Sequence, residues 1–163
     1  INKVEPSLIR VEADEVTYNM HIFVRFELEQ ALLTGELDVA DVPDAWNAKY
    51  EEYLGITPPD DALGCLQDIH WSHATIGYFP TYTLGNLMSA QIFKQAEEEL
   101  PDLKAKIGKA EFEPMLDWLR TKVHRHGSKF TAPELLDREF GEPMSAQPLL
   151  DYLRAKYTEI YNL

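Results

Sequence analysis

Apolar positions along the chain recur mostly at spacings of three and four residues, which is the period of an amphipathic α-helix. The longest such stripe lies within residues 7–34, and it predicts one long helix that begins after Pro6 and ends at Gly35. A second stripe predicts a helix over residues 44–54, with Gly55 as its end. In the second helix, the residues expected to turn inward are Ala45, Trp46, Tyr50, Tyr53 and Leu54.

Further stripes follow a turn at residues 57–60. They predict helices over residues 61–71, 81–100, 112–123, 131–139 and 146–161. The alternating β-branched pattern of a strand is missing, apart from one short segment at residues 37–42. Because no internal repeat or linker interrupts the chain, we expect a mostly α fold in which residues 1–163 form a single bundle-like helical lobe.

Composition excludes several classes of partner. Of the 163 residues 45% are hydrophobic, which is enough for a buried core, and 28 acidic against 15 basic residues give a formal charge of −13. This charge repels phosphate backbones and anionic lipids, so nucleic acid and membrane surfaces are not expected partners. The chain also lacks the roughly 20 consecutive apolar residues of a membrane span. The single cysteine, Cys65, cannot form an internal disulfide, and a cytoplasmic location fits best.

Two polar groupings lie near the N-terminus. On the predicted helix Arg10 and Asp14 are four residues apart, and the simplest interpretation of that spacing is an ordinary surface ion pair. Asp14, Tyr18 and His21 would share one helical face, where a polar stripe beside the core is favoured over a hydrogen-bonded site. Neither grouping indicates a function by itself.

A denser polar cluster lies in the middle of the chain. His70 and His73 are three residues apart and could bind one metal ion with Asp68 as a third ligand, although a packed, hydrogen-bonded histidine is the more usual outcome. The tyrosines Tyr78 and Tyr82 are either core aromatics or hydroxyl donors that point into a cleft. The sequence contains no H-E-x-x-H, G-x-S-x-G or glycine-rich phosphate loop. These residues alone therefore predict only an acidic helical domain.

Two longer motifs change this interpretation. Residues 9–15 read IRVEADE and residues 64–71 read GCLQDIHW, and they resemble the I-R-x-x-A-D-E and G-x-x-Q-D-x-H-W motifs of the M32 family of metallocarboxypeptidases, the carboxypeptidase Taq type. Further segments resemble the same family in the same order, so that the resemblance covers essentially the whole chain. These segments are TYNMHIFVRFELE, GYFPTYTLGNLMSAQ, HRHGSKF and DYLRAKYTEIYNL.

The resemblance also indicates what the chain lacks. The zinc site of the family is an H-E-x-x-H helix plus a further glutamate, both upstream of I-R-x-x-A-D-E, and neither is present here. The resemblance therefore implies the C-terminal part of a larger helical zinc carboxypeptidase, which agrees with a first residue, Ile1, that is not methionine. Zinc is expected in the full-length enzyme, with no ligand from this segment, which alone would be inactive and bind no cofactor.

For the substrate, the resemblance implies a role for Arg10. A carboxypeptidase recognises the free α-carboxylate of a peptide, and a guanidinium group can donate two parallel hydrogen bonds to it. Gln67 and Asp68 would support this binding wall, and Asp68 could accept a ring proton from a histidine and so fix its tautomer. These three residues are the expected substrate-binding group.

For catalysis, the resemblance implies neutral donors that stabilise the oxyanion formed during hydrolysis. His70, Tyr78 and Tyr82 fit that role, and His73 with Tyr78 has a comparable spacing, so the choice between the two histidines stays open. The alternative function is a non-catalytic helical interaction module that keeps these residues only for packing. Expected partners are the peptide C-terminus, the missing N-terminal part of the protein and a second copy in a homodimer.

Overall fold

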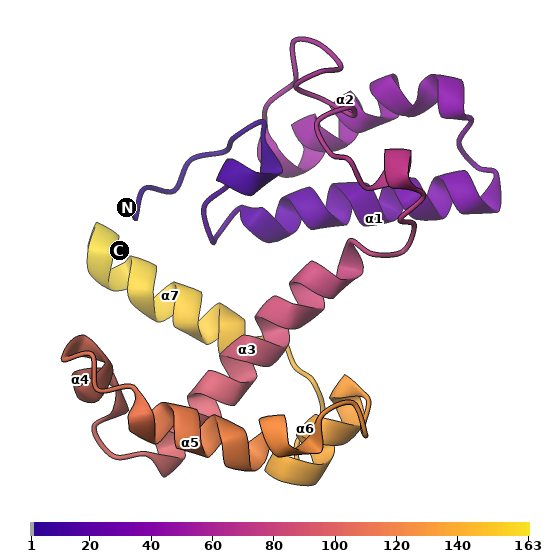
Figure 1. Ribbon diagram of the computed structural model, residues 1–163. Coiled ribbons are helices and arrows are strands. Elements are labelled where there is room, and N and C mark those ends of the chain that lie inside the picture. Colours follow the sequence, from indigo (N-terminus) through magenta and orange to yellow (C-terminus); the bar gives the residue numbers. More distant parts are fainter. Residues whose placement is uncertain (1) are drawn as a thin grey trace. The chain divides into compact units, whose positions relative to one another are not determined.

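The computed structural model describes residues 2–163, and every regular element in that range is helical (Figure 1). The α-helices are α1 (Tyr18–Thr34), α2 (Val42–Leu54), α3 (Pro80–Glu99), α4 (Leu103–Gly108), α5 (Glu113–Lys122), α6 (Ala132–Phe140) and α7 (Gln147–Tyr161). Short 3-10 helices cover Arg10–Glu12, Val39–Asp41, Trp71–His73 and His124–His126. The predicted mostly α fold is thus confirmed. Within the described range, none of these helices has both the length and the apolar character that a bilayer span requires.

The chain divides into two compact units, of which the first extends to Leu84 and the second runs from Gly85 to Leu163. Helix α3 contributes its first turn to one unit and the rest to the other. The single lobe expected for residues 1–163 stays a prediction.

The core of the first unit lies between α1 and α2. Val24 and Leu28 of α1 belong to the same buried cluster as Trp46 and Tyr50 of α2, and in both pairs the residues are four apart, as one face of a helix requires. Each helix ends at a glycine, as predicted, because Gly35 and Gly55 take positive φ angles of 76° and 68°. The same cluster includes Cys65, and burial raises the pKa of its thiol.

The helix predicted from residue 7 onward is wrong over its first part, because α1 begins only at Tyr18. Before it, the carboxylate of Asp14 accepts hydrogen bonds of 2.9 and 3.0 Å from the backbone amides two and three residues later. This local bonding replaces the helical ladder with a turn. Arg10 and Asp14 therefore do not face each other on a helix, and the predicted surface ion pair is wrong.

Two further predictions fail in the same unit. Residues 61–71 form successive turns that lead into the 3-10 helix at Trp71, rather than one short helix. The segment at residues 37–42 is not a strand, because it holds a 3-10 helix and the first residue of α2. The boundary of α3 is correct to one residue.

The second unit has a separate core, in which Ala96, Leu103 and Trp118 are buried. The indole nitrogen of Trp118 donates a 2.8 Å hydrogen bond to Glu99, which ties α5 to the end of α3. Helix α6 begins with a capping box, in which Thr131 and Glu134 satisfy each other's backbone amides. The short helix α4 was not predicted from the sequence.

Candidate functional site

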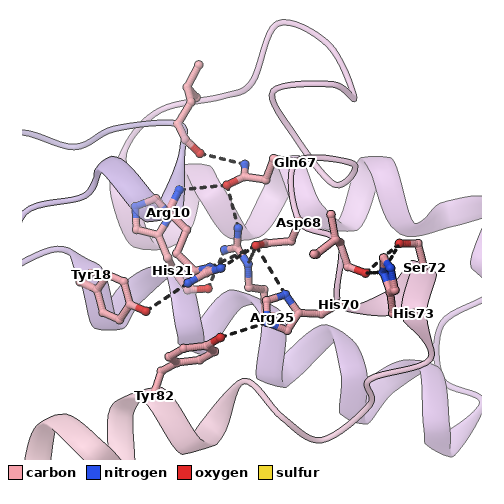
Figure 2. A network of polar contacts seen from close by, with 12 residues as sticks. Arg10, Tyr18, His21, Arg25, Gln67, Asp68, His70, Ser72, His73 and Tyr82 are labelled. Carbon is pink, nitrogen blue, oxygen red and sulfur yellow. Dashed lines mark hydrogen bonds and ion pairs between the residues drawn. The ribbon is translucent and has the colours of Figure 1, made fainter.

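One carboxylate, that of Asp68, lies between two buried arginines in the first unit (Figure 2). Arg10 donates from Nε and Nη2 to the two oxygens of Asp68, at 3.2 and 2.7 Å. Arg25 donates from Nε to Asp68 Oδ2 at 2.5 Å. We refer to these three residues as the Arg–Asp–Arg cluster. Its side chains are 7%, 13% and 0% exposed for Arg10, Asp68 and Arg25, so the charges interact away from bulk water.

Three separate segments deliver these side chains. Arg10 belongs to the first 3-10 helix, Arg25 projects from the core face of α1, and Asp68 follows the turns after α2. The guanidinium of Arg25 lies 4.5 Å from the ring centre of Trp46, and its Nη1 donates to the carbonyl of His21 at 2.8 Å. Trp46 of α2 and His21 of α1 thus hold the side chain of Arg25 in place.

Gln67 connects the same segments through its amide. Its Oε1 accepts from the backbone nitrogen of Arg10 at 3.0 Å and from Nη2 of Arg25 at 2.8 Å. Its Nε2 donates to the carbonyls of Leu8 and Leu63 at 2.9 and 3.0 Å. Because an amide has two acceptor positions and two donor hydrogens, these contacts use its full capacity, and Gln67 holds the loop rather than offering a free group.

The cluster carries an excess of positive charge. Burial by itself raises the pKa of Asp68, but hydrogen bonds and Coulomb attraction from both arginines outweigh it, so this pKa is lowered. Burial by itself lowers the pKa of Arg10, but its bonds to Asp68 outweigh that effect, so this pKa is raised. Asp68 is therefore ionised near neutral pH. Because arginine side chains stay protonated in proteins, two guanidinium groups against one carboxylate leave one positive charge in excess.

His70 extends the cluster toward the start of α3. Its Nε2 lies 3.1 Å from the hydroxyl of Tyr82, and its Nδ1 lies 3.6 Å from Asp68 Oδ1. The ring packs against the buried Phe79, with ring centres 4.4 Å apart. The structure therefore brings His70, Asp68 and Tyr82 into one polar network (Figure 2).

An aromatic group borders this network. The ring of Tyr78 lies 5.8 Å from that of His70 and 5.5 Å from that of Tyr82, measured between ring centres. Tyr78 is exposed, and the guanidinium of Arg10 lies 5.1 Å from the ring centre of Tyr82. Arg10, His70 and the two tyrosines thus come together, as one shared site requires.

His73 lies apart from the network. Its Nδ1 faces the carbonyl of Ile69 at 2.9 Å and the hydroxyl of Ser72 at 3.2 Å, and Figure 2 shows it away from Tyr82. Within residues 2–163 no three or more His, Cys, Asp or Glu side chains are grouped so as to hold a metal ion. Asp68, His70 and His73 therefore do not form the three-ligand alternative in this part of the chain.

Arg25 and His21 also belong to this site. Arg25 was not predicted, and His21 was expected to share one helical face with Asp14 and Tyr18, but Asp14 precedes α1, so that shared face does not form. His21 is fully buried, its Nδ1 lies 3.1 Å from the hydroxyl of Tyr50, and its Nε2 has no hydrogen-bond partner among the described residues. Burial, followed by the charges of Arg25 and Arg10, lowers the pKa of His21 to about 4. His21 and Arg25 are four residues apart on α1, so they lie on one face of the helix, but that spacing alone does not show that an arginine points inward.

The family model described as Carboxypeptidase Taq (M32) metallopeptidase matches residues 1–157. Thermostable carboxypeptidase 1 of Thermus thermophilus is 54% identical over 99% of this chain, which covers 32% of that protein. Carboxypeptidase 1 of Bacillus subtilis is 45% identical over 100% of this chain and 32% of that protein.

Solved structures give the same result. A crystal structure of an M32 carboxypeptidase from Deinococcus radiodurans matches with a TM-score of 0.96 and 47% identity, covering 100% of this chain and 33% of that one. A structure of Pyrococcus furiosus carboxypeptidase matches with a TM-score of 0.93 and 47% identity, covering 96% of this chain and 31% of that one. The chain thus spans about a third of the length of these proteins.

Proposed function

The chain belongs to the carboxypeptidase Taq (M32) metallopeptidase family, and on this premise we propose that it is the C-terminal, substrate-binding part of a zinc-dependent carboxypeptidase. The family resemblance of its two motifs is confirmed by the match over residues 1–157. The proposed activity of the full-length protein is hydrolytic release of C-terminal residues from peptides. The observation that carries the proposal is the network that joins Arg10 to His70 and Tyr82 through Asp68.

Arg10 is the proposed ligand of the substrate carboxylate. Three of its five N–H groups donate to Asp68 and to the hydroxyl of Tyr18, the latter at 3.1 Å. Nη1 and Nη2 carry two hydrogens each, so one N–H on each of these atoms can still donate to a carboxylate. The excess positive charge of the Arg–Asp–Arg cluster supports this role, because a buried positive charge attracts an anion strongly.

Tyr82, His70 and Tyr78 are the proposed donors to the oxyanion that forms when the last peptide bond is attacked. Tyr82 lies within hydrogen-bond distance of His70 Nε2, while Nδ1 of the same ring faces Asp68. With the ring proton on Nδ1, the Tyr82 hydroxyl donates to Nε2 and can turn to the oxyanion as that charge develops. The exposed hydroxyl of Tyr78 would be a second donor. One such donor typically lowers the barrier by about 2.7–4 kcal/mol. We propose His70 rather than His73 because His73 bonds to its own loop.

The test is Arg10→Lys in the full-length enzyme. Lysine keeps the charge but loses the planar fork, so we expect KM for peptides to rise by about tenfold or more, the equivalent of one charge-assisted hydrogen bond, with a smaller change in kcat. The matched control is Arg154→Lys, which changes an exposed arginine of α7. If Arg10→Lys folds, as shown by its melting temperature, and keeps the wild-type KM, Arg10 does not bind the carboxylate.

Three further assignments are part of the proposal. We propose that zinc is the metal of the full-length enzyme and that its ligands lie outside this chain, which agrees with the metallopeptidase family and the absence of a metal-binding group within residues 2–163.

A homodimer is supported by large apolar side chains at the surface, such as Val39, and sedimentation of the full-length protein would test it. The free thiol of Cys65 supports a cytoplasmic location, where thiols stay reduced.

A further inference from the structure

Arg25 is the most completely buried charged group in the Arg–Asp–Arg cluster, and the proposed function assigns no role to it. Its Nε and Nη2 donate to Asp68 and Gln67, two residues of the GCLQDIHW motif, at 2.5 and 2.8 Å. Its Nη1 donates to the carbonyl of His21 at 2.8 Å. With no exposed surface, Arg25 cannot touch a peptide, so any effect on a substrate must pass through the residues it holds.

The contacts of Asp68 show how such an effect arises. Its carboxylate is shared, because Arg10 bonds to both oxygens while Arg25 bonds to one of them from the core side. A cluster of Arg10 and Asp68 alone would have no net charge. With Arg25 present, its positive charge offsets the negative charge of Asp68. The positive charge of Arg10 is then left to attract an anion.

We propose that Arg25 is a positioning residue that offsets the charge of Asp68, so that Arg10 keeps its attraction for the carboxylate of a peptide C-terminus. This inference rests on the proposed function of Arg10. A second contact supports it: the guanidinium of Arg25 lies 4.5 Å from the ring centre of the buried Trp46, and this packing keeps its charge beside Asp68.

The experiment measures inhibition of the full-length enzyme by the free amino acid that the assay peptide releases, and by the amide of that amino acid. The two probes differ only in the carboxylate. The variants are Arg25→Met, which removes the charge but keeps much of the apolar stem, and the double variant Arg25→Met with Asp68→Asn. In the double variant Arg10 is again the one unopposed charge. Arg154→Met is the matched control at an exposed position.

We expect Arg25→Met to raise the Ki of the free amino acid by about tenfold or more and to leave that of the amide unchanged. The double variant should recover most of that loss, even if its kcat is low. A purely structural Arg25 would weaken both probes alike, or lower only kcat and the melting temperature, and the second substitution would not restore binding. Either of those results overturns the inference.

If Arg25→Met does not fold, Asp68→Asn is compared with the double variant, because these two differ only at residue 25. The inference then requires tighter binding of the free amino acid to Asp68→Asn, and equal Ki values overturn it. The proposed function fails separately. If the wild-type enzyme binds the amino acid and its amide equally well, Arg10 does not recognise a carboxylate, and both proposals are wrong.

Discussion

The buried histidine of α1 makes the first unit sensitive to acid. His21 has no exposed surface and lies beside Arg25 and Arg10, so burial and two positive charges favour its neutral form. Its pKa falls from an ordinary 6.5 to about 4 in the folded chain. A depressed pKa means that the unfolded chain binds the proton more tightly than the folded chain. The stability that depends on neutral His21 is therefore present above pH 6.5 and is lost as the pH falls toward 4.

The two pKa values set the size of the effect. Between pH 7 and pH 5 the unfolded chain takes up about 0.7 of a proton at this position and the folded chain takes up little. Linkage then predicts a loss of about 2 kcal/mol from the free energy of unfolding, rising to about 3 kcal/mol at pH 4. This is a large share of the stability of a small domain.

The assay is urea unfolding of the 163-residue chain at pH 7 and pH 5, followed by tryptophan fluorescence, with His21→Gln as the matched variant. Glutamine does not titrate. Between pH 7 and pH 5 the His21→Gln variant should therefore lose about 2 kcal/mol less stability than the wild-type chain, whatever the stability of the variant at pH 7. Proton NMR of the His21 ring gives the folded pKa directly. The reasoning is refuted if both chains lose the same stability, or if the ring titrates near 6.5.

Two other predictions concern single side chains. Both carboxylate oxygens of Glu29, which is 3% exposed, accept hydrogen bonds, one from the indole of Trp71 and one from a loop amide, so Glu29→Gln should lower the free energy of unfolding by about 1–3 kcal/mol. An unchanged urea midpoint would contradict this. Thr131→Ala removes the hydroxyl of the capping box with Glu134 and should cost the second unit about 1 kcal/mol by thermal unfolding. The exposed Thr158 provides an alanine control that should stay within about 0.5 kcal/mol of wild type.

Most of the helices could be predicted because their signals are local. The glycine stops at Gly35 and Gly55 and the capping residues around Thr131 act within one helical turn, and the structure places helix ends at each of them. The failures occur where a polar side chain bonds to the backbone or to distant residues. Asp14 replaces the expected first turns of α1, and the loop that carries Gln67 is held by residues far away in the sequence.

Some residues of the candidate site could likewise be predicted from the sequence, and others could not. The two motifs already indicated the family, and they selected Arg10, Gln67, Asp68 and His70 as polar groups that belong together. Arg25 was missed because an arginine in an amphipathic helix ordinarily points to solvent, and only the packing on Trp46 shows that it points inward.

By itself, the sequence determined the helical class, most helix ends and the family, because each depends on local patterns or on long matching motifs. Only the tertiary structure decided which charges meet. Arg10 pairs with Asp68, which is 58 residues away, rather than with Asp14, which is four residues away. The reason is that a buried guanidinium must find its carboxylate inside the folded chain, where burial makes the pairing strong, and spacing along the sequence does not contain that information.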